Sequence, residues 1–354
     1  MAAKIKDVAR LAGVSTATVS RVLSNEGYVS EEARKSVLAA MEQLRYQPSR
    51  LARSLRVQRS RIIGLLISDI QNPFFISLVR AVEDIALQHQ YAVFLCNADE
   101  NSEKEKFYLD LMQAERVAGV IVSPTRERDD PCLQLFQADI PFVVIDRKLA
   151  DVNVDTVVVD NIQYTYQLVK HLLEDGHRRI GAVLGISTAT TGRERYEGYA
   201  QALTEYQLPL SPELLRTSIP REENGYHLTN ELLDLAEPPT ALFVGNNLLT
   251  VGAFRAISER GRTIPDDIAL AAFDEVDWMS LVKPGLTVIK QPTYDIGRTA
   301  AELLFQRIAD PLLSVQQITV HCTLNIRQSC GLHQNTGVPA SQVVQAAQKE
   351  REIV

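Results

Sequence analysis

The sequence lacks any apolar run long enough to cross a membrane as a helix, which takes about 18–20 residues. Its best run is Ile62–Ile67. The opening residues 1–7 also lack the apolar centre of a signal peptide, so we expect a cytoplasmic protein. The four cysteines form no C-x-x-C pair, which favours reduced structural thiols over a redox or metal site.

The motifs of several enzyme classes are missing as well. The chain has no G-x-x-x-x-G-K-[ST], G-x-G-x-x-G, G-x-S-x-G or H-E-x-x-H sequence. Its six histidines form no pair at metal-ligand spacing. We therefore expect no enzymatic activity, no cofactor and no bound metal.

What is present is a globular composition with an uneven charge distribution. The 354 residues are 45% hydrophobic and 23% charged, which suits a folded protein of more than one domain. Residues 1–61 carry a net charge of +7, whereas the rest carries −14. A basic head on an acidic body suggests a polyanionic partner for the head, although a solvated basic face would give the same charge.

Helical periodicity in the head predicts a helix-turn-helix. Residues 5–12 form an amphipathic pattern that Gly13 should end, because glycine adopts the left-handed turn found there. Ser15 or Thr16 can cap a second helix that runs to about Leu23. A third helix over 31–45 would complete a small apolar core.

The second helix has the small polar surface that fits a DNA major groove. Ala17 or a threonine methyl can touch a thymine methyl, and Arg21 can bind guanine through two hydrogen bonds. The predicted DNA-binding residues of this region are Ser15, Thr16, Ala17, Thr18, Arg21 and Asn25.

A second candidate DNA-binding segment follows at residues 48–56. Pro48 favours the first turn of a helix, but so short a helix is marginal in water. We expect it to order only on DNA and beside a second copy, with Arg53, Leu55 and Arg56 as its DNA-binding residues. Leu55 would then act as an apolar wedge in the minor groove. The alternative is a plain basic linker.

From residue 61 onward, strand-like runs alternate with helical stretches, which predicts parallel sheets in two lobes. The runs are Ile62–Ile67, Tyr91–Leu95, Gly119–Val122, Phe142–Ile145, Thr156–Val159, Ile180–Leu184, Ala241–Val244, Ile268–Phe273 and Leu286–Ile289. The helical stretches include Phe75–Gln88, Glu103–Glu115, Ile162–Glu174, Arg193–Tyr206, Glu222–Leu235, Leu248–Arg260 and Tyr294–Ile308.

Ligands of such sheets bind beyond the carboxyl ends of the strands. Aspartate, asparagine and arginine side chains with an aromatic face suit a small hydroxylated ligand there. The predicted effector-binding residues are Asp69, Phe74, Phe75, Arg147, Arg193, Arg195, Asn246, Asn247, Asp274 and Gln291. An aromatic residue such as Phe75 more often packs in the core than stacks on a ligand, and Asp146, Asp160 and Asn161 could cap helices or brace loops.

The three arginines favour a sugar acid over a neutral sugar, because guanidinium groups pair well with carboxylates. The alternative is that the arginines are permanent ion-pair partners of nearby aspartates, which would leave a neutral sugar as the ligand.

The head motif Ile5-Lys6-Asp7-Val8-Ala9, the Gly13–Leu23 stretch and the Pro48–Leu55 segment resemble the lactose-repressor/galactose-repressor (LacI/GalR) family of bacterial transcriptional regulators. The resemblance covers nearly all of the chain, to about Gly331. It implies an N-terminal all-α helix-turn-helix head with a hinge helix, followed by an α/β two-lobed periplasmic-binding-protein-like core. It also implies a homodimer on double-stranded, pseudo-palindromic operator DNA, hence a nucleoid-associated protein.

By the same resemblance, the DNA-binding domain is 1–47, the hinge 48–61 and the effector-binding core 62–331. Lobe one would comprise 62–161 plus 292–322, and lobe two 162–290 plus 324–331. Residues 332–354 lack leucine heptads, so we expect a dimer with a loose tail.

Residue by residue, Phe74 matches the family's ligand-stacking position and Arg195 its effector-binding arginine. Asn246 and Asp274 match positions that bind effector hydroxyls. Two positions depart from the family: Asn247 stands where an aspartate is usual, and Pro220 falls near a position where some members place an aromatic lid.

The predicted function is a repressor released from its operator by a sugar or sugar acid, controlling genes of carbohydrate catabolism. The alternatives are the sugar-binding protein of a transporter and a purine-type regulator that depends on a corepressor.

Overall fold

The computed structural model describes residues 4–24, 28–44, 46, 60–128, 130–150 and 152–331. It divides the chain into a head that ends at Ser60 and a core that begins at Arg61. Several predicted features lie outside the described residues, namely Asn25, the hinge 48–56 with Arg53, Leu55 and Arg56, and the tail 332–354.

The head contains the three predicted helices, α1 (Ile5–Ala12), α2 (Thr16–Ser24) and α3 (Glu31–Gln43). Gly13 ends α1 with a φ of +67°, in the left-handed region that glycine adopts without a steric penalty. The Ser15 hydroxyl caps α2 by accepting a hydrogen bond from the Thr18 amide at 3.1 Å.

The three helices of the head are held together by a small apolar core. Its fully buried members all carry small or branched side chains: Val8, Ala9, Val19, Val22, Val37 and Ala40. The helical periodicity of the head therefore predicted a small apolar core correctly.

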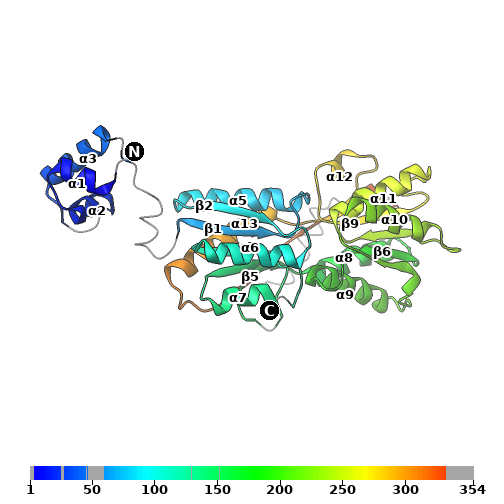
Figure 1. The fold of residues 1–354 in the computed structure, drawn as a ribbon. Coiled ribbons are helices and arrows are strands. Elements are labelled where there is room, and N and C mark those ends of the chain that lie inside the picture. Colours follow the sequence, from blue (N-terminus) through cyan, green and yellow to red (C-terminus); the bar gives the residue numbers. More distant parts are fainter. Residues whose placement is uncertain are drawn as a thin grey trace, which may run out of the picture. The chain divides into compact units, whose positions relative to one another are not determined.

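The core contains two six-stranded sheets, which confirms the predicted two-lobed α/β architecture (Figure 1). Sheet one has the order β11 (Gln317–Val320), β5 (Asp155–Val159), β4 (Phe142–Ile145), β3 (Gly119–Val122), β1 (Ile62–Ile67), β2 (Ala92–Asn97). Sheet two has the order β12 (Thr323–Asn325), β10 (Thr287–Lys290), β9 (Ala269–Phe273), β8 (Ala241–Val244), β6 (Ile180–Leu184), β7 (Leu215–Thr217). All pairings are parallel except that of β12 with β10. We refer to each sheet with its helices as lobe one and lobe two.

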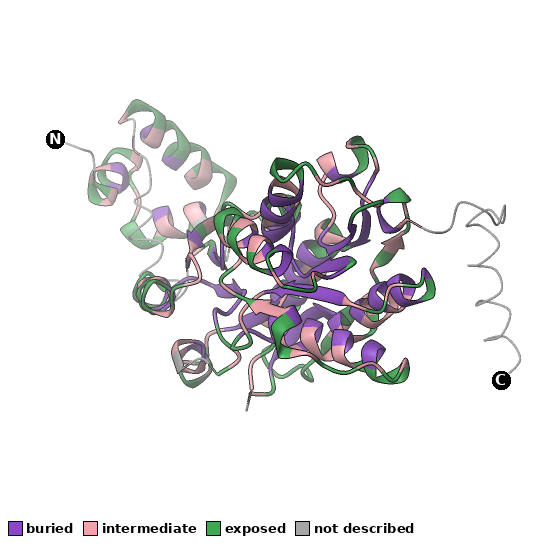
Figure 2. Ribbon diagram, turned by 90° about the vertical axis from the view of Figure 1, so that its right-hand side faces the viewer, coloured by how far each residue is buried: buried purple, intermediate pink, exposed green. Residues whose placement is uncertain are grey.

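Helices cover both faces of each sheet. The helices of lobe one are α5 (Phe74–Gln88), α6 (Ser102–Ala114), α7 (Asp130–Gln137) and α13 (Thr293–Ala309). Those of lobe two are α8 (Asn161–Glu174), α9 (Thr190–Glu205), α10 (Glu222–Leu233), α11 (Asn247–Glu259) and the short α12 (Trp278–Leu281). The strands are therefore buried on both sides, seen as the purple centre of Figure 2, and this explains their continuous apolar sequences. None of the described helices is both long and apolar enough to span a bilayer.

Three strands were not predicted. β7 and β12 have only three residues each, and a strand of three residues is too short to show a recognisable alternating pattern. β11 lies at the edge of sheet one, where its side chains alternate between exposed and half-buried. Edge strands need no continuous apolar run, so the residues of β11 carry no pattern that marks a strand.

The two-lobed fold brings polar loops of both lobes together. The chain passes from sheet one to sheet two after β5, returns after β10, and crosses again between β11 and β12. Loops at the carboxyl ends of strands in both lobes therefore line one cavity.

Candidate functional site

A cavity of about 430 Å³, which includes solvent at its mouth, lies between loops of the two lobes. Lobe one contributes Ser68, Asn72, Phe74, Phe75, Glu100, Asp146 and Arg147 to its lining. Lobe two contributes Gly185, Thr191, Gly192, Arg195, Pro220, Gly245, Asn246 and Asp274. The lining is thus mainly polar, with one aromatic edge.

In lobe two, Arg195 is held by acceptors of the chain itself. Its Nη1 donates to the Gly245 carbonyl at 2.5 Å and to Asp274 Oδ2 at 3.3 Å, and its Nε donates to Asn161 Oδ1 at 3.0 Å. The guanidinium also lies 3.8 Å from the centre of the Phe273 ring, a cation–π contact. Arg195 is therefore fixed and its charge is balanced by Asp274.

Asp274 receives further hydrogen bonds from side chains of lobe two. Gln291 Nε2 donates to Oδ1 at 2.5 Å, and Asn246 Nδ2 approaches Oδ2 at 3.4 Å. The Asn246 Oδ1 atom caps α11 by accepting from the Leu248 amide at 2.8 Å. The Asp274 carboxylate is buried but surrounded by donors, which is the condition for a charge inside a protein.

In lobe one, Arg147 pairs with Glu100. Two guanidinium nitrogens of Arg147 bind the two Glu100 oxygens at 2.5 and 2.9 Å, and Nη1 also donates to the Pro124 carbonyl at 2.9 Å. This is the two-pronged geometry that arginine forms with carboxylates. The remaining Nε lies 3.6 Å from Asp146 Oδ2, too far for a hydrogen bond, and finds no acceptor among the described residues.

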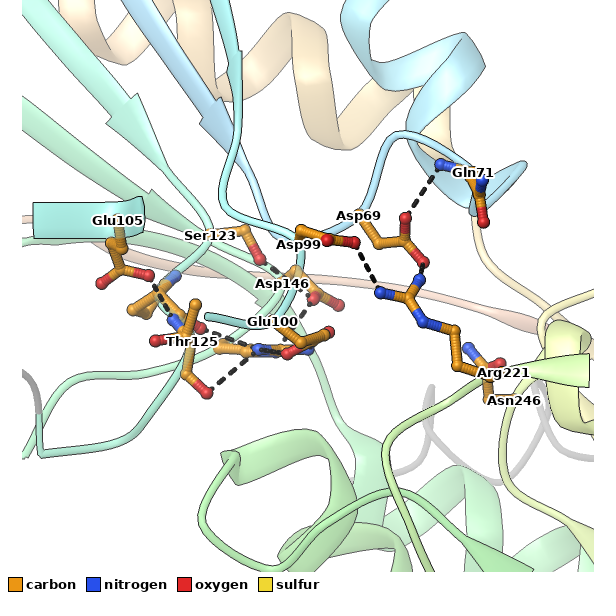
Figure 3. A network of polar contacts seen from close by, with 12 residues as sticks. Asp69, Gln71, Asp99, Glu100, Glu105, Ser123, Thr125, Asp146, Arg221 and Asn246 are labelled. Atoms are coloured by element: carbon orange, nitrogen blue, oxygen red, sulfur yellow. Dashed lines mark hydrogen bonds and ion pairs between the residues drawn. The ribbon is translucent and has the colours of Figure 1, made fainter. Parts of the chain in front are cut away.

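Asp146 faces this free N–H from a half-buried position, with its side chain 11% exposed, and Ser123 Oγ donates to its Oδ2 at 3.3 Å (Figure 3). Burial raises the pKa of the Asp146 carboxyl from 3.8 to about 6, although Arg147 and Arg195 favour the charged form. Asp146 and Arg147 therefore place an acceptor and a donor side by side at the cavity.

Asp146 and Asp274 occupy equivalent places in the two lobes. Asp146 follows β4 with a φ of +65°, and Asp274 follows β9 with a φ of +72°. The backbone amide of Asp146 donates to the Val157 carbonyl of β5, and that of Asp274 donates to the Ile289 carbonyl of β10. Left-handed backbone at a residue other than glycine is uncommon and is concentrated at functional sites.

Six of the predicted effector-binding residues line the cavity, and four do not. Those in the lining are Phe74, Phe75, Arg147, Arg195, Asn246 and Asp274. Phe75 is only 2% exposed and packs edge-on against Phe74, so it belongs largely to the core of lobe one, as the alternative interpretation held.

The four remaining residues have other partners. Asp69 is paired with Arg221, and Gln291 binds Asp274 from behind the lining. Asn247 donates to Asn72 Oδ1 at 2.9 Å, which links the two lobes. Arg193 is paired with Glu127 and Glu197. Arg193 and Arg195 face different sides of α9 because residues two apart on a helix point about 200° apart.

Three residues at or beside the cavity were not predicted: Glu100, Thr191 and Arg221. Glu100 stands three residues after β2, so the rule applied to the other strands would have found it. Thr191 lies in the first turn of α9, which begins three residues earlier than predicted. Arg221 precedes α10 and follows no predicted strand, and no sequence signal marks it.

In the head, the predicted DNA-binding residues cluster on α2. Thr16, Ala17 and Arg21 are exposed and Thr18 is half-buried. Ser15 is exposed as well, but its hydroxyl already serves as the cap of α2. Thr16, Ala17 and Arg21 are therefore the exposed members of the predicted set on this helix.

Two family models match the chain. One, described as bacterial regulatory proteins of the lacI family, matches residues 4–49. The other, described as periplasmic binding proteins and sugar binding domain of the LacI family, matches residues 60–328. Together they cover the head and the core.

Relatives and solved structures point to the same family over more than nine tenths of the chain. An HTH-type transcriptional repressor PurR from Mannheimia succiniciproducens is 36% identical over 92% of this chain and 98% of its own. A PurR from Actinobacillus pleuropneumoniae serotype 3 is 37% identical over the same shares. The lac repressor dimer bound to operator and the anti-inducer ONPF is 28% identical, with a TM-score of 0.80 over 93% of this chain and 99% of that one. A complex of the transcriptional regulator CelR with cellobiose is 29% identical, with a TM-score of 0.69 over 92% and 99%.

Proposed function

The chain belongs to the LacI family of bacterial regulatory proteins. We propose that it leaves its operator when a neutral hydroxylated ligand fills the cavity of the core. The coarser function follows from the family and its relatives: the protein is a DNA-binding transcriptional repressor. The family consists of regulators and not of enzymes. The proposal concerns the ligand, the dimer and the direction of the response.

The observation that carries the ligand class is the gap between Asp146 and Arg147. A hydroxyl group can accept from Arg147 Nε and donate to the Asp146 carboxylate at once, which a carboxylate ligand cannot do. The other side chains offer matching chemistry, with Asn246 for further hydroxyls and Phe74 for the apolar face of a sugar ring.

The charges of the lining argue against the sugar acid that the sequence favoured. The cavity carries three carboxyls, Glu100, Asp146 and Asp274, against the two guanidinium groups of Arg147 and Arg195. Each arginine already has a carboxylate partner, and Arg193 is not part of the lining. An added carboxylate would therefore meet no unbalanced positive charge. That CelR is recorded with cellobiose, a neutral sugar, supports the same class.

A thermal-shift screen with matched ligands tests the ligand class. The panel pairs glucose with glucuronate, galactose with galacturonate and cellobiose with cellobionate, and adds hypoxanthine and guanine for the purine-type alternative. A ligand at one hundred times its dissociation constant stabilises the folded state by about 2.7 kcal/mol. We expect a neutral sugar to raise the melting temperature more than its acid. A larger rise with an acid or with a purine would overturn the proposed class.

A homodimer is proposed from exposed apolar side chains on α5 and α12. Ile76 is 67% exposed and Leu281 is 77% exposed, and both helices lie along the same side of the core in Figure 1. Such side chains favour a self-association surface. Acting on operator DNA, the dimer would work in the cytoplasm at the nucleoid.

Sedimentation velocity checks the dimer through two substitutions and a control. Leu281→Asp and Ile76→Asp should shift the protein towards monomer, because a charge at the centre of an apolar interface is costly. Leu312→Asp changes a leucine that is even more exposed, at 93%, outside these two helices and should leave the dimer intact. An unchanged sedimentation coefficient for both interface variants would place the dimer elsewhere.

A further inference from the structure

Arg221 connects the two lobes at the edge of the cavity. It stands directly before α10 in lobe two, and its guanidinium binds Asp69 and Asp99 of lobe one, the second at 2.5 Å (Figure 3). We propose that Arg221 is a positioning residue that holds the Pro220 wall of the cavity in place and ties the lobes together there. The proposal rests on the proposed function only in so far as the cavity is the ligand site.

The segment that carries Arg221 is well anchored within lobe two. The Ser218 amide bonds the Leu184 carbonyl at the end of β6, and the Gly225 amide bonds the Arg221 carbonyl in the first turn of α10. Pro220, the next residue towards β7, forms part of the cavity lining. The contacts of the Arg221 side chain therefore restrain Pro220, the neighbouring residue in the chain and part of the cavity wall.

Its partners in lobe one are placed just as closely to the cavity. Asp69 follows Ser68, and Asp99 precedes Glu100, and both Ser68 and Glu100 line the cavity. The Glu100 amide donates a hydrogen bond to the Ser68 carbonyl at 2.8 Å, which joins the two loops. Arg221 thus joins a wall of lobe two to a two-loop unit of lobe one.

The two carboxylates depend on Arg221 to different degrees. The Asp69 side chain is 4% exposed, and burial raises its pKa, opposed by the Gln71 amide and by Arg221. Asp99 is more exposed, and Lys104 lowers its pKa first, ahead of Arg221. Loss of Arg221 would leave Asp69 as a buried carboxylate without a cation, whereas Asp99 would keep Lys104 at 3.0 Å.

Other contacts between the lobes lie on different loops and supply a control. Arg193 of α9 binds Glu127 at 2.9 Å, and Lys148 binds Glu194 at 2.6 Å. These pairs involve neither the Pro220 segment nor the loops at Asp69 and Asp99. If any ion pair between lobes held the wall, removing the Arg193 pair would loosen it as well.

Hydrogen–deuterium exchange of the full-length, ligand-free protein tests the proposal. Arg221→Met keeps the length of the side chain and removes its charge, and Asp69→Asn keeps the acceptor for the Gln71 amide. Both should speed exchange in peptides that cover residues 66–75 and 215–224, by about tenfold, which corresponds to about 1.4 kcal/mol. Asp99→Asn should have a smaller effect. Asp99 is the more exposed of the two partners, and Arg221 would keep its ion pair with the buried Asp69.

The double variant and the salt dependence separate positioning from general destabilisation. Arg221→Met with Asp69→Asn should exchange no faster than the faster single variant, because both remove one interaction. Raising NaCl from 50 to 500 mM should speed exchange in the wild type but not in Arg221→Met.

Two control variants should leave these peptides unchanged: Arg193→Met, which breaks another contact between lobes, and Arg260→Met, which breaks a pair within lobe two and lies outside both peptides. Unchanged exchange in Arg221→Met, or equal acceleration in Arg193→Met, would overturn the proposal. Should Arg221→Met fail to fold, Arg221→Lys, which cannot bridge both carboxylates as a fork, must show the same two peptides accelerated. No ligand or DNA enters the experiment, so its failure is distinct from failure of the proposed function.

Discussion

Asp146 is the residue whose acid–base chemistry is most directly changed by its place in the cavity. Its carboxyl is buried beside Glu100 and Asp274, both acids, and faces the guanidinium groups of Arg147 and Arg195. Burial outweighs these arginines and raises the pKa to about 6. The folded state therefore holds the proton more tightly than the unfolded state does.

Asp146→Asn should change how stability depends on pH. Because the folded pKa is raised, the contribution of Asp146 to stability is present below about pH 4 and is lost as the pH rises through about 6. The asparagine variant lacks this loss, so its stability relative to the wild type should improve by about 1–3 kcal/mol between pH 4.5 and pH 7.5. Urea unfolding at the two pH values measures the difference. A constant difference would show that Asp146 does not titrate in this range.

Arg21 is the candidate for base reading in the head. It is exposed on α2, and its planar side chain suits two hydrogen bonds to guanine. Arg21→Ala should cost about 1–3 kcal/mol of operator binding and relax the preference at one position per half-site. Selection from a randomised operator library measures this. Lys35→Ala, an exposed change on α3, should leave the sequence preference unaltered, and equal preference profiles for Arg21→Ala and wild type would remove the base-reading role.

The positions of site residues could be predicted where they follow recognisable strands. Asp274 and Arg147 were found because the strands before them are continuous apolar runs. What the sequence could not supply is which partner each group takes. Asp69 was expected to meet the ligand, yet Arg221 binds it from a position 152 residues away in the chain. Such pairings depend on the relation between the lobes, which local patterns do not encode.

At the scale of elements, close helix packing explains why glycines stand inside two helices of the core. Gly252 of α11 lies against the backbone of α10, where an added Cβ would collide with the Glu222 carbonyl oxygen and the Tyr226 amide nitrogen. Gly297 of α13 lies in the same way against Leu78 of α5. Glycine normally weakens a helix, so its presence here reflects the approach of the two backbones.

Gly252→Ala should destabilise lobe two by forcing α10 and α11 apart. Overpacking of this kind typically costs about 1–3 kcal/mol of folding free energy. The higher helix propensity of alanine stabilises the helix by only about 1 kcal/mol. Ser258→Ala, on an exposed position of the same helix, should be neutral or slightly stabilising. Thermal unfolding of both variants gives the comparison, and a Gly252→Ala protein as stable as the wild type would show that the helices can separate freely.

Element types were predictable from periodicity, whereas several boundaries were not. The strands β1, β3, β4, β6 and β8 begin and end where their apolar runs do. Helix α9 begins at Thr190, three residues before the predicted start, because Thr190 and Gly192 are buried against neighbouring loops although neither carries the apolar pattern of a helix face. Burial of small polar residues is decided by tertiary packing and leaves no periodic signal.

In the whole molecule, a ligand in the cavity of the core is expected to change how the head binds the operator. The cavity lies between loops of both lobes, so a ligand there can favour one relation of the lobes over another. The predicted hinge, with Arg53, Leu55 and Arg56, joins head and core in the sequence and lies outside the described residues. Its role as an element that orders on DNA and is released by the effector stays a prediction.

Operator affinity with and without effector shows whether the ligand in the core controls the head. The operator is the site selected from the randomised library, and the effector is the compound that gives the largest thermal shift. Fluorescence anisotropy should show operator affinity falling by a factor that corresponds to about 1–3 kcal/mol at saturating effector. By linkage, operator DNA must weaken effector binding by the same factor. An operator affinity that stays constant across saturating effector would contradict the account.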